Sequence, residues 1–93
     1  MEELAVEHEP NLVISGLSGE FIQNGVTVQV SIVRLEGEPD WTLEVVNAAG
    51  TSTVWNDVFS SDEAAYAEFE RTVAEEGIRT FLDNANVIPF KRR

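Results

Sequence analysis

Hydrophobic and polar residues alternate along the first half of this chain, on both sides of an Asn24-Gly25 pair. Asn-Gly favours a two-residue type I′ turn, because both central residues need a positive φ that these two adopt at low cost. The sequence therefore predicts a hairpin over residues 17–35. Its expected pairs are Gln23 with Val26, Phe21 with Val28, Gly19 with Val30 and Leu17 with Ile32. In that register one face is apolar throughout, formed by Leu17, Phe21, Val26, Val28, Val30 and Ile32.

Two more strands are predicted beyond a polar turn at residues 36–40, where Pro39 cannot donate to a central ladder. Residues 41–46 alternate, and their inward positions are Trp41, Leu43 and Val45. Residues 47–50 resemble a three-residue hairpin loop with a left-handed glycine at its end. That loop leads into a strand over residues 51–56, with Asn47 expected opposite Thr51, Val45 opposite Thr53 and Leu43 opposite Trp55. The pattern therefore predicts a four-stranded antiparallel meander.

A helix is predicted to begin at Ser60, which is a good N-cap residue. Glu63 follows three residues later, and the pair has the spacing of a capping box. Apolar residues then recur at helical spacing from Ala65 to Leu82. The sequence therefore predicts a long amphipathic helix that lies on the sheet.

Gly77 allows two interpretations of the end of this helix. A glycine after Glu76 would end it there, with Ile78 folding back onto the last turn. Alternatively, the glycine would let a continuous helix pack closely on the sheet. The apolar stripe stays in phase beyond Gly77, so we expect the helix to continue to about Asp83.

These elements predict an α+β fold, a four-stranded antiparallel β-meander followed by one long amphipathic helix packed on one sheet face (ββββα). Residues 12–83 would form the single domain, residues 1–11 a flexible acidic arm and residues 84–93 an extended C-terminal tail. A length of 93 residues with 43% hydrophobic content fits one hydrophobic core.

One helix covers only one sheet face, which leaves an opposite, outer face. Four aliphatic side chains are expected to project from the outer face: Ile22, Val33, Val46 and Val54. The candidate covers are the chain's own residues 12–14 or 87–90, or a second copy of the chain. Without a cover they would be scattered surface residues. These four positions are the candidate interaction face.

The charge balance is the extreme feature of the composition, with 17 acidic residues, six basic ones and a net charge of −11. Three of the bases are Lys91, Arg92 and Arg93, so residues 1–90 carry −14. Such a body repels phosphate backbones, and we expect no direct nucleic-acid binding by it. The acidity otherwise favours solubility or a basic partner protein.

The residue types also disfavour most enzymatic chemistry. Cysteine is absent, and the single histidine, His8, lies between Glu7 and Glu9 in the acidic arm. Neither a Ser-His-Asp triad nor a glycine-rich phosphate loop is present. We therefore expect no catalytic, cofactor-binding or metal-binding residues and no cofactor. The sequence also shows no membrane span and no basic signal-peptide start, so a cytoplasmic location is expected.

Residues 54–65 and 75–82, with residues 40–46 before them, resemble a group of short bacterial proteins of the β-meander-plus-helix type that have no assigned activity. The resemblance spans about residues 15–83. The chain is more loosely similar to HicB-like antitoxin domains, in which a meander leads through a capped turn into an Ala-rich helix. It departs from them because no DNA-binding helix-turn-helix or ribbon-helix-helix segment follows, which puts operator binding in doubt.

These observations predict a small acidic protein that acts as a non-enzymatic interaction module and self-associates as a homodimer. An alternative is an acidic inhibitor or antitoxin-like protein that covers a basic partner surface. A second alternative is a small enzyme whose site is shared across a dimer interface, where carboxylates or His8 from two chains would converge.

Overall fold

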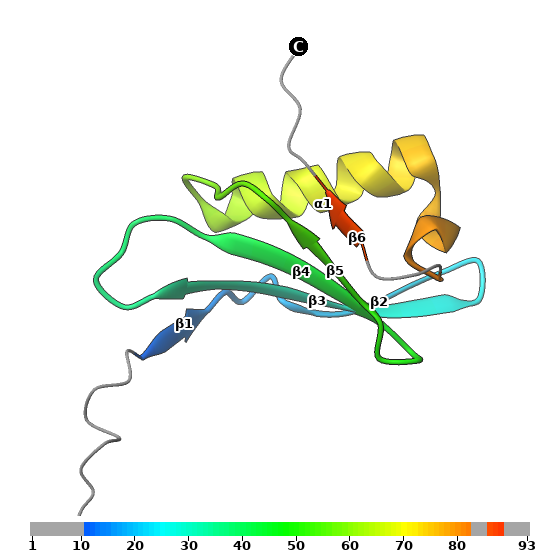
Figure 1. Ribbon diagram of the computed structural model, residues 1–93, viewed down its shortest axis with the longest axis horizontal. Coiled ribbons are helices and arrows are strands. Elements are labelled where there is room, and N and C mark those ends of the chain that lie inside the picture. The colour runs from blue at the N-terminus through cyan, green and yellow to red at the C-terminus, as the bar shows by residue number, and fades with distance from the viewer. Residues whose placement is uncertain (1–10, 83–85, 89–93) are drawn as a thin grey trace, which may run out of the picture.

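The computed structural model describes residues 11–82 and 86–88. Its elements are β1 (Leu12–Ile14), β2 (Gly19–Gln23), β3 (Val26–Leu35), β4 (Thr42–Asn47), β5 (Ser52–Trp55), α1 (Asp62–Glu76), the 3-10 helix η2 (Ile78–Leu82) and β6 (Asn86–Ile88). Helix α1 lies on one face of the sheet (Figure 1). The predicted α+β fold, a meander followed by a packed helix, is confirmed, and the described sheet has six strands instead of the expected four.

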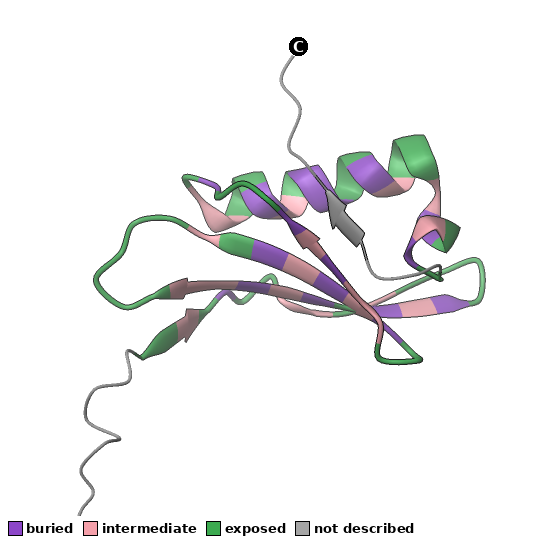
Figure 2. Ribbon diagram, in the orientation of Figure 1, coloured by how far each residue is buried: buried purple, intermediate pink, exposed green. Residues whose placement is uncertain are grey.

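The hairpin forms in the predicted register. Gln23 pairs with Val26 and Phe21 with Val28. Asn24 and Gly25 both have positive φ, 53° and 78°, as a type I′ turn requires. Burial alternates along β3, which Figure 2 shows as changing colours along the strand. Local turn chemistry and the apolar pattern were sufficient to define this hairpin.

The predicted Leu17–Ile32 pair is wrong, because the chain leaves the ladder before Gly19. The Ser18 hydroxyl accepts a hydrogen bond from the Ile32 amide (3.0 Å) and donates one to the Ile32 carbonyl (3.2 Å). The Ser15 amide also donates to that carbonyl (2.9 Å). Side-chain bonds therefore replace strand pairing here, and Leu17 is exposed instead of facing the core.

β1 occupies the part of the β3 edge that β2 leaves uncovered. Its register pairs Leu12 with Leu35, Val13 with Arg34 and Ile14 with Val33. The turn between β1 and β2 is tied to the helix start, since the buried Ser15 hydroxyl donates to Asp62 Oδ2 (2.8 Å). Thus β1 and β2 follow one another along the same edge of β3.

The second hairpin also has the predicted register, with Val45 opposite Thr53. Gly50 has φ of 89° and closes the expected loop. Asn47 Oδ1 accepts hydrogen bonds from two loop amides, those of Ala49 and Thr51 (2.9 Å each). On its other edge β5 pairs in parallel with β6. Residues 86–88 of the expected tail therefore extend the sheet.

The helix begins one residue later than predicted. Ser61 is the N-cap, and its hydroxyl accepts a hydrogen bond from the Ala64 amide (3.0 Å). The capping box predicted for Ser60 and Glu63 is therefore wrong. Phe59, the residue before Ser60, is still held by two backbone hydrogen bonds to Trp41 (2.8 Å each). This bridge delays the turn into the helix, and the neighbouring serine supplies the same capping chemistry.

The helix ends at Glu76, so the predicted continuation to Asp83 is also wrong. Gly77 has φ of 88° and ψ of 150°, and its amide donates to the Val73 carbonyl (2.9 Å). The following η2 buries Ile78 and Phe81, which stand one 3-10 turn apart. The 3-10 helix η2 thus buries the same apolar residues that a continued α-helix was expected to bury. The apolar pattern alone therefore does not distinguish the two structures.

Gly77→Ala should destabilise the protein by about 1–2 kcal/mol, because an L side chain is strained at this φ and ψ. No atom lies within 4 Å of the added Cβ, so the cost comes from the backbone alone. Gly16→Ala is the matched control, since its Cβ also has open space and its φ is not in the positive region. Urea denaturation of both variants measures the difference. Equal stabilities would contradict the assignment of strain to Gly77.

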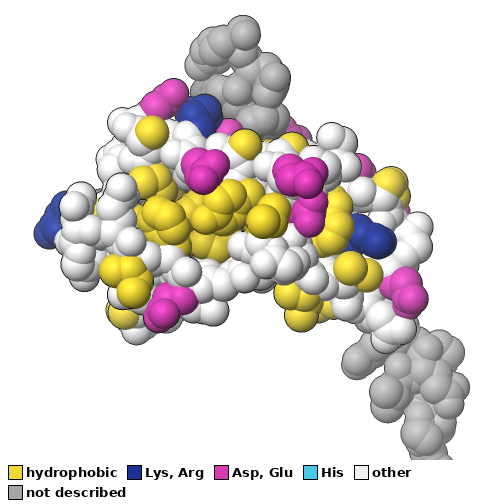
Figure 3. All heavy atoms as spheres, turned by 180° about the vertical axis from the view of Figure 1, so that it is seen from behind, with side chains coloured by type: hydrophobic (Ala, Val, Ile, Leu, Met, Phe, Trp, Pro, Cys, Tyr) yellow, Lys and Arg dark blue, Asp and Glu magenta, His cyan; other side chains and the backbone are white. Residues whose placement is uncertain are grey.

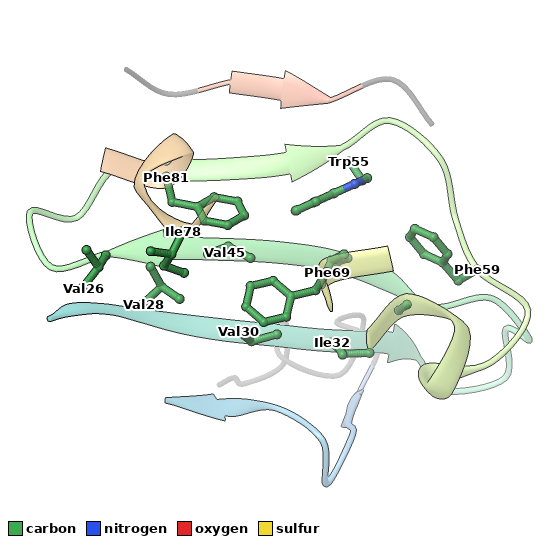
Figure 4. Close-up of a cluster of buried hydrophobic side chains, with 12 residues drawn as sticks. Val26, Val28, Val30, Ile32, Val45, Trp55, Phe59, Phe69, Ile78 and Phe81 are labelled. Atoms are coloured by element: carbon green, nitrogen blue, oxygen red, sulfur yellow. The ribbon is translucent and has the colours of Figure 1, made fainter. Parts of the chain in front are cut away.

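The core lies between the inner sheet face and the two helices. Its largest fully buried side chains are Phe69, Phe81, Ile32, Leu43, Val28 and Val45. Figure 4 shows Phe69 and Phe81 projecting over the sheet toward Val30 and Val45. The buried Asn47 side chain donates to the Phe81 carbonyl (2.7 Å), so η2 is fastened to the end of β4. The core thereby fixes which sheet face remains outside.

Candidate interaction face

The outer face of the sheet is where the predicted interaction residues are found. Ile22 is 62% exposed, and Val33, Val46 and Val54 are half-buried. The register separates several of them by polar neighbours: Ile22 lies opposite Thr27, Val46 lies between Gln29 and Ser52, and Val54 lies opposite Glu44. The structure therefore disperses these four positions along the sheet instead of gathering them.

A denser apolar surface lies at the β1 end of the same face. Leu12 and Ile14 of β1 stand opposite Leu35 and Val33 of β3, so all four side chains project outward. Ile14 is 68% exposed, and Leu12 and Leu35 are also exposed. We call these four residues the β1–β3 patch. It places adjacent aliphatic side chains on a sheet face that no described element covers.

A pocket of about 440 Å³ lies beside the β1–β3 patch. Its lining residues are Leu12, Val33, Arg34, Leu35, Glu38, Asp40, Thr42 and Val58. Val58 is exposed and belongs to the loop after β5, just before the bridge between Phe59 and Trp41. The volume is within the range of small-ligand and side-chain pockets. The lining has four aliphatic residues, Leu12, Val33, Leu35 and Val58, and two acidic ones, Glu38 and Asp40.

Arg34 is the one basic residue of this lining, and it is held by the adjacent turn. Its guanidinium lies 5.2 Å from the centre of the Trp41 ring and donates to the Glu38 carbonyl (3.1 Å). The carboxylates of Glu38 and Asp40 remain exposed. The rim of the pocket thus presents the negative charge of Glu38 and Asp40. The positive charge of Arg34 is engaged with the Trp41 ring and the Glu38 carbonyl.

A second apolar area lies between β2 and α1. Phe21 packs edge to face on the buried Phe69, with ring centres 4.9 Å apart, and Tyr66 packs on the same ring. Figure 3 shows hydrophobic side chains gathered in a band across this side of the molecule. Since these residues already pack on the core, this area is the margin of the core. In the described part of the chain, by contrast, none of the four residues of the β1–β3 patch belongs to the core or packs against it.

The buried carboxylate of Glu68 belongs to a structural network and not to the candidate face. It accepts hydrogen bonds from Trp55 Nε1 (3.1 Å) and from Arg71 Nε and Nη2 (2.9 and 2.6 Å). Arg71 also donates to Glu75 (2.6 Å). The hydrogen bond to Glu68 and the two neighbouring carboxylates raise the pKa of Arg71, although partial burial opposes them. This network fastens α1 to β5.

The part of the chain that the structure describes contains no group of three or more His, Cys, Asp or Glu side chains placed to hold a metal ion. No helix in that part is long and apolar enough to cross a membrane. His8 and the rest of the expected acidic arm up to residue 10, like the basic residues 91–93, lie outside the described residues. The expectation of no catalytic site stays a prediction.

Sequence reasoning missed Leu12, Ile14 and Leu35 as members of an outer patch. It considered residues 12–14 as a cover for the outer face, whereas they join the sheet edge and add their own outward side chains. The available signal was strand length, because ten-residue β3 is longer than five-residue β2. The unpaired end of β3 needed another strand, and Leu12-Val13-Ile14 was the nearest β-prone segment.

No family model matches this chain, and no match was found among curated proteins or solved structures. The resemblance to short bacterial proteins and the looser similarity to HicB-like domains therefore stay predictions. Any assignment of function has to come from the geometry and charge of the described residues.

Proposed function

We propose that this chain is a non-enzymatic protein-interaction module that self-associates through its outer sheet face. The β1–β3 patch carries the proposal, because it is a contiguous aliphatic surface on a face that no described element covers. Burying an exposed Leu, Ile or Val side chain contributes about 1.5–3 kcal/mol at most. Four such side chains are enough for a weak association, although the loss of rigid-body freedom opposes it.

Ile14→Glu should weaken the dimer at least about tenfold, because it places a carboxylate at the centre of the apolar contact. Ile14 is mostly exposed in the single chain, so the substitution leaves the fold intact. Leu82→Glu is the matched control, since it adds the same charge to an exposed residue of η2. Sedimentation equilibrium at low and high salt measures both. The proposal fails if the unmodified chain is monomeric at every concentration, or if the two variants behave alike.

A basic partner protein is the second candidate. The pocket rim carries Glu38 and Asp40, and the chain as a whole has a net charge of −11. A partner with lysines or arginines around an apolar side chain would complement this rim. This candidate predicts capture of a basic protein at low salt, lost at high salt, by a chain that stays monomeric alone. Self-association at both salt concentrations would favour the first candidate.

A further inference from the structure

The pocket beside the β1–β3 patch combines two requirements for an occupant. Leu12, Val33, Leu35 and Val58 provide aliphatic walls, which suit one bulky apolar side chain. The carboxylates of Glu38 and Asp40 at the rim suit a basic residue next to that side chain. An occupant should therefore be a short segment with an apolar anchor followed by positive charge.

The chain itself contains such a segment after β6. Residues 89–93 read Pro-Phe-Lys-Arg-Arg, which is one aromatic residue followed by three of the six basic residues of the whole chain. The other three are Arg34, Arg71 and Arg79, and Arg34 and Arg71 are engaged with Trp41 and Glu68. Residues 91–93 thus hold half of the positive charge of a strongly acidic molecule.

The chain reaches the end of β6 at the same end of the sheet as the pocket. β6 runs parallel to β5 and places Ile88 beside Trp55. Thr42, which lines the pocket, begins β4, and β4 runs antiparallel to β5. The five residues that follow Ile88 lie outside the described residues. The last described residue before them, Ile88, is at the end of the sheet where the pocket lies.

We infer that the pocket receives residues 89–93 of a second copy, with Phe90 between the aliphatic walls and residues 91–93 against Glu38 and Asp40. This inference rests on the proposed self-association and names the segment that the outer face binds. It also explains how an acidic chain could associate, since each copy would bring a compensating basic segment to the acidic end of its partner.

Reach favours the segment of a second copy over the chain's own. Two residues of fully extended chain span about 7 Å, which is the distance available between Ile88 and Phe90. β3 lies three strands away from β6 in the sheet order, which corresponds to about 14 Å. Even a fully extended backbone after Ile88 would therefore end, at Phe90 of the same chain, short of the pocket walls on β3 and β1. Exchange of this segment between two copies would form a closed, two-fold dimer.

The first test is Phe90→Ala in the full chain, with Leu82→Ala as the control for loss of an apolar side chain elsewhere. Phe90→Ala should weaken the dimer at least about tenfold by sedimentation equilibrium, and the control should leave it unchanged. If Phe90→Ala dimerises as tightly as the unmodified chain while Ile14→Glu does not, the outer face is an interface and the docking of residues 89–93 is overturned.

The second test uses disulfide trapping, which is clean because the chain has no cysteine. One chain carries Val58→Cys in the pocket wall and the other carries Lys91→Cys, so that Phe90 is retained. Mixing the two under mild oxidation should give a mixed disulfide dimer faster than either variant dimerises alone. Its absence overturns the inference. A double variant that instead closes a disulfide within one monomeric chain shows docking of the chain's own segment, which also overturns it.

Discussion

Phe69→Ala should strongly destabilise this fold, with an expected loss of about 3–5 kcal/mol. Phe69 is fully buried at the centre of the interface between α1 and the sheet. Its ring contacts those of Phe21, Tyr66 and Phe81, with centroid distances of 4.9, 5.6 and 5.9 Å. The substitution therefore loses apolar burial and three aromatic contacts together. The total stability of folded proteins is about 5–15 kcal/mol, so this loss is a large share of it.

Urea denaturation followed by tryptophan fluorescence measures this loss, because Trp55 is buried in the same core. Phe69→Leu is the matched control and should cost about 1–2 kcal/mol, since it keeps most of the apolar volume. Tyr66→Ala should cost less than Phe69→Ala, because Tyr66 is only partly buried. A loss below 1 kcal/mol for Phe69→Ala would mean that the helix does not pack on the sheet through this residue.

The sequence predicted those parts of the fold that neighbouring residues determine. The Asn24-Gly25 turn fixes its own hairpin, and the loop ending at Gly50 fixes the second one, so both registers were correct. In each case the turn residues have backbone angles that only a few residue types adopt easily. No distant contact was needed to define either hairpin.

Other features depend on contacts between distant residues, and there sequence reasoning was insufficient. Ser15 and Ser18 bind the backbone of Ile32, between the parts of β3 that pair with β1 and with β2. Nothing near these serines in the sequence indicates that partner. The end of the helix at Gly77 was one of two open interpretations, and only the packing of η2 on the core decides between them.

In the candidate site, too, features set by neighbouring residues were predicted and features set by distant contacts were not. Alternation along each strand correctly placed Ile22 and Val33 away from the core, because the side chains of a strand alternate between the two faces. Which outward residues are adjacent depends on the pairing between strands. The Leu12–Leu35 pair joins residues 23 positions apart, so the β1–β3 patch could not be derived without first placing β1.

Arg71→Ala should destabilise the protein by about 2–3 kcal/mol, far more than an ordinary surface ion pair contributes. Its partner Glu68 is only 5% exposed, and Arg71 provides two of its hydrogen bonds. Removing the guanidinium takes two charge-assisted hydrogen bonds away from a buried carboxylate. The expected loss is below that of a fully buried pair because the Arg71 side chain is itself half-exposed and partly solvated.

Glu75→Ala is the matched control, since it removes the exposed partner of the same arginine and should cost no more than about 0.5 kcal/mol. The loss of stability in Arg71→Ala should not change with pH in the neutral and mildly alkaline range. The pKa of Arg71 is raised further in the folded protein, so the stability linked to its charge is present at all pH values below its unfolded pKa.

Arg71 therefore stays charged between about pH 7 and pH 9. The stability difference between Arg71→Ala and the unmodified protein should consequently stay the same over this range. Urea denaturation at several pH values measures this difference. A difference that falls as the pH rises from about 7 to 9 would contradict a contribution from the charge of Arg71.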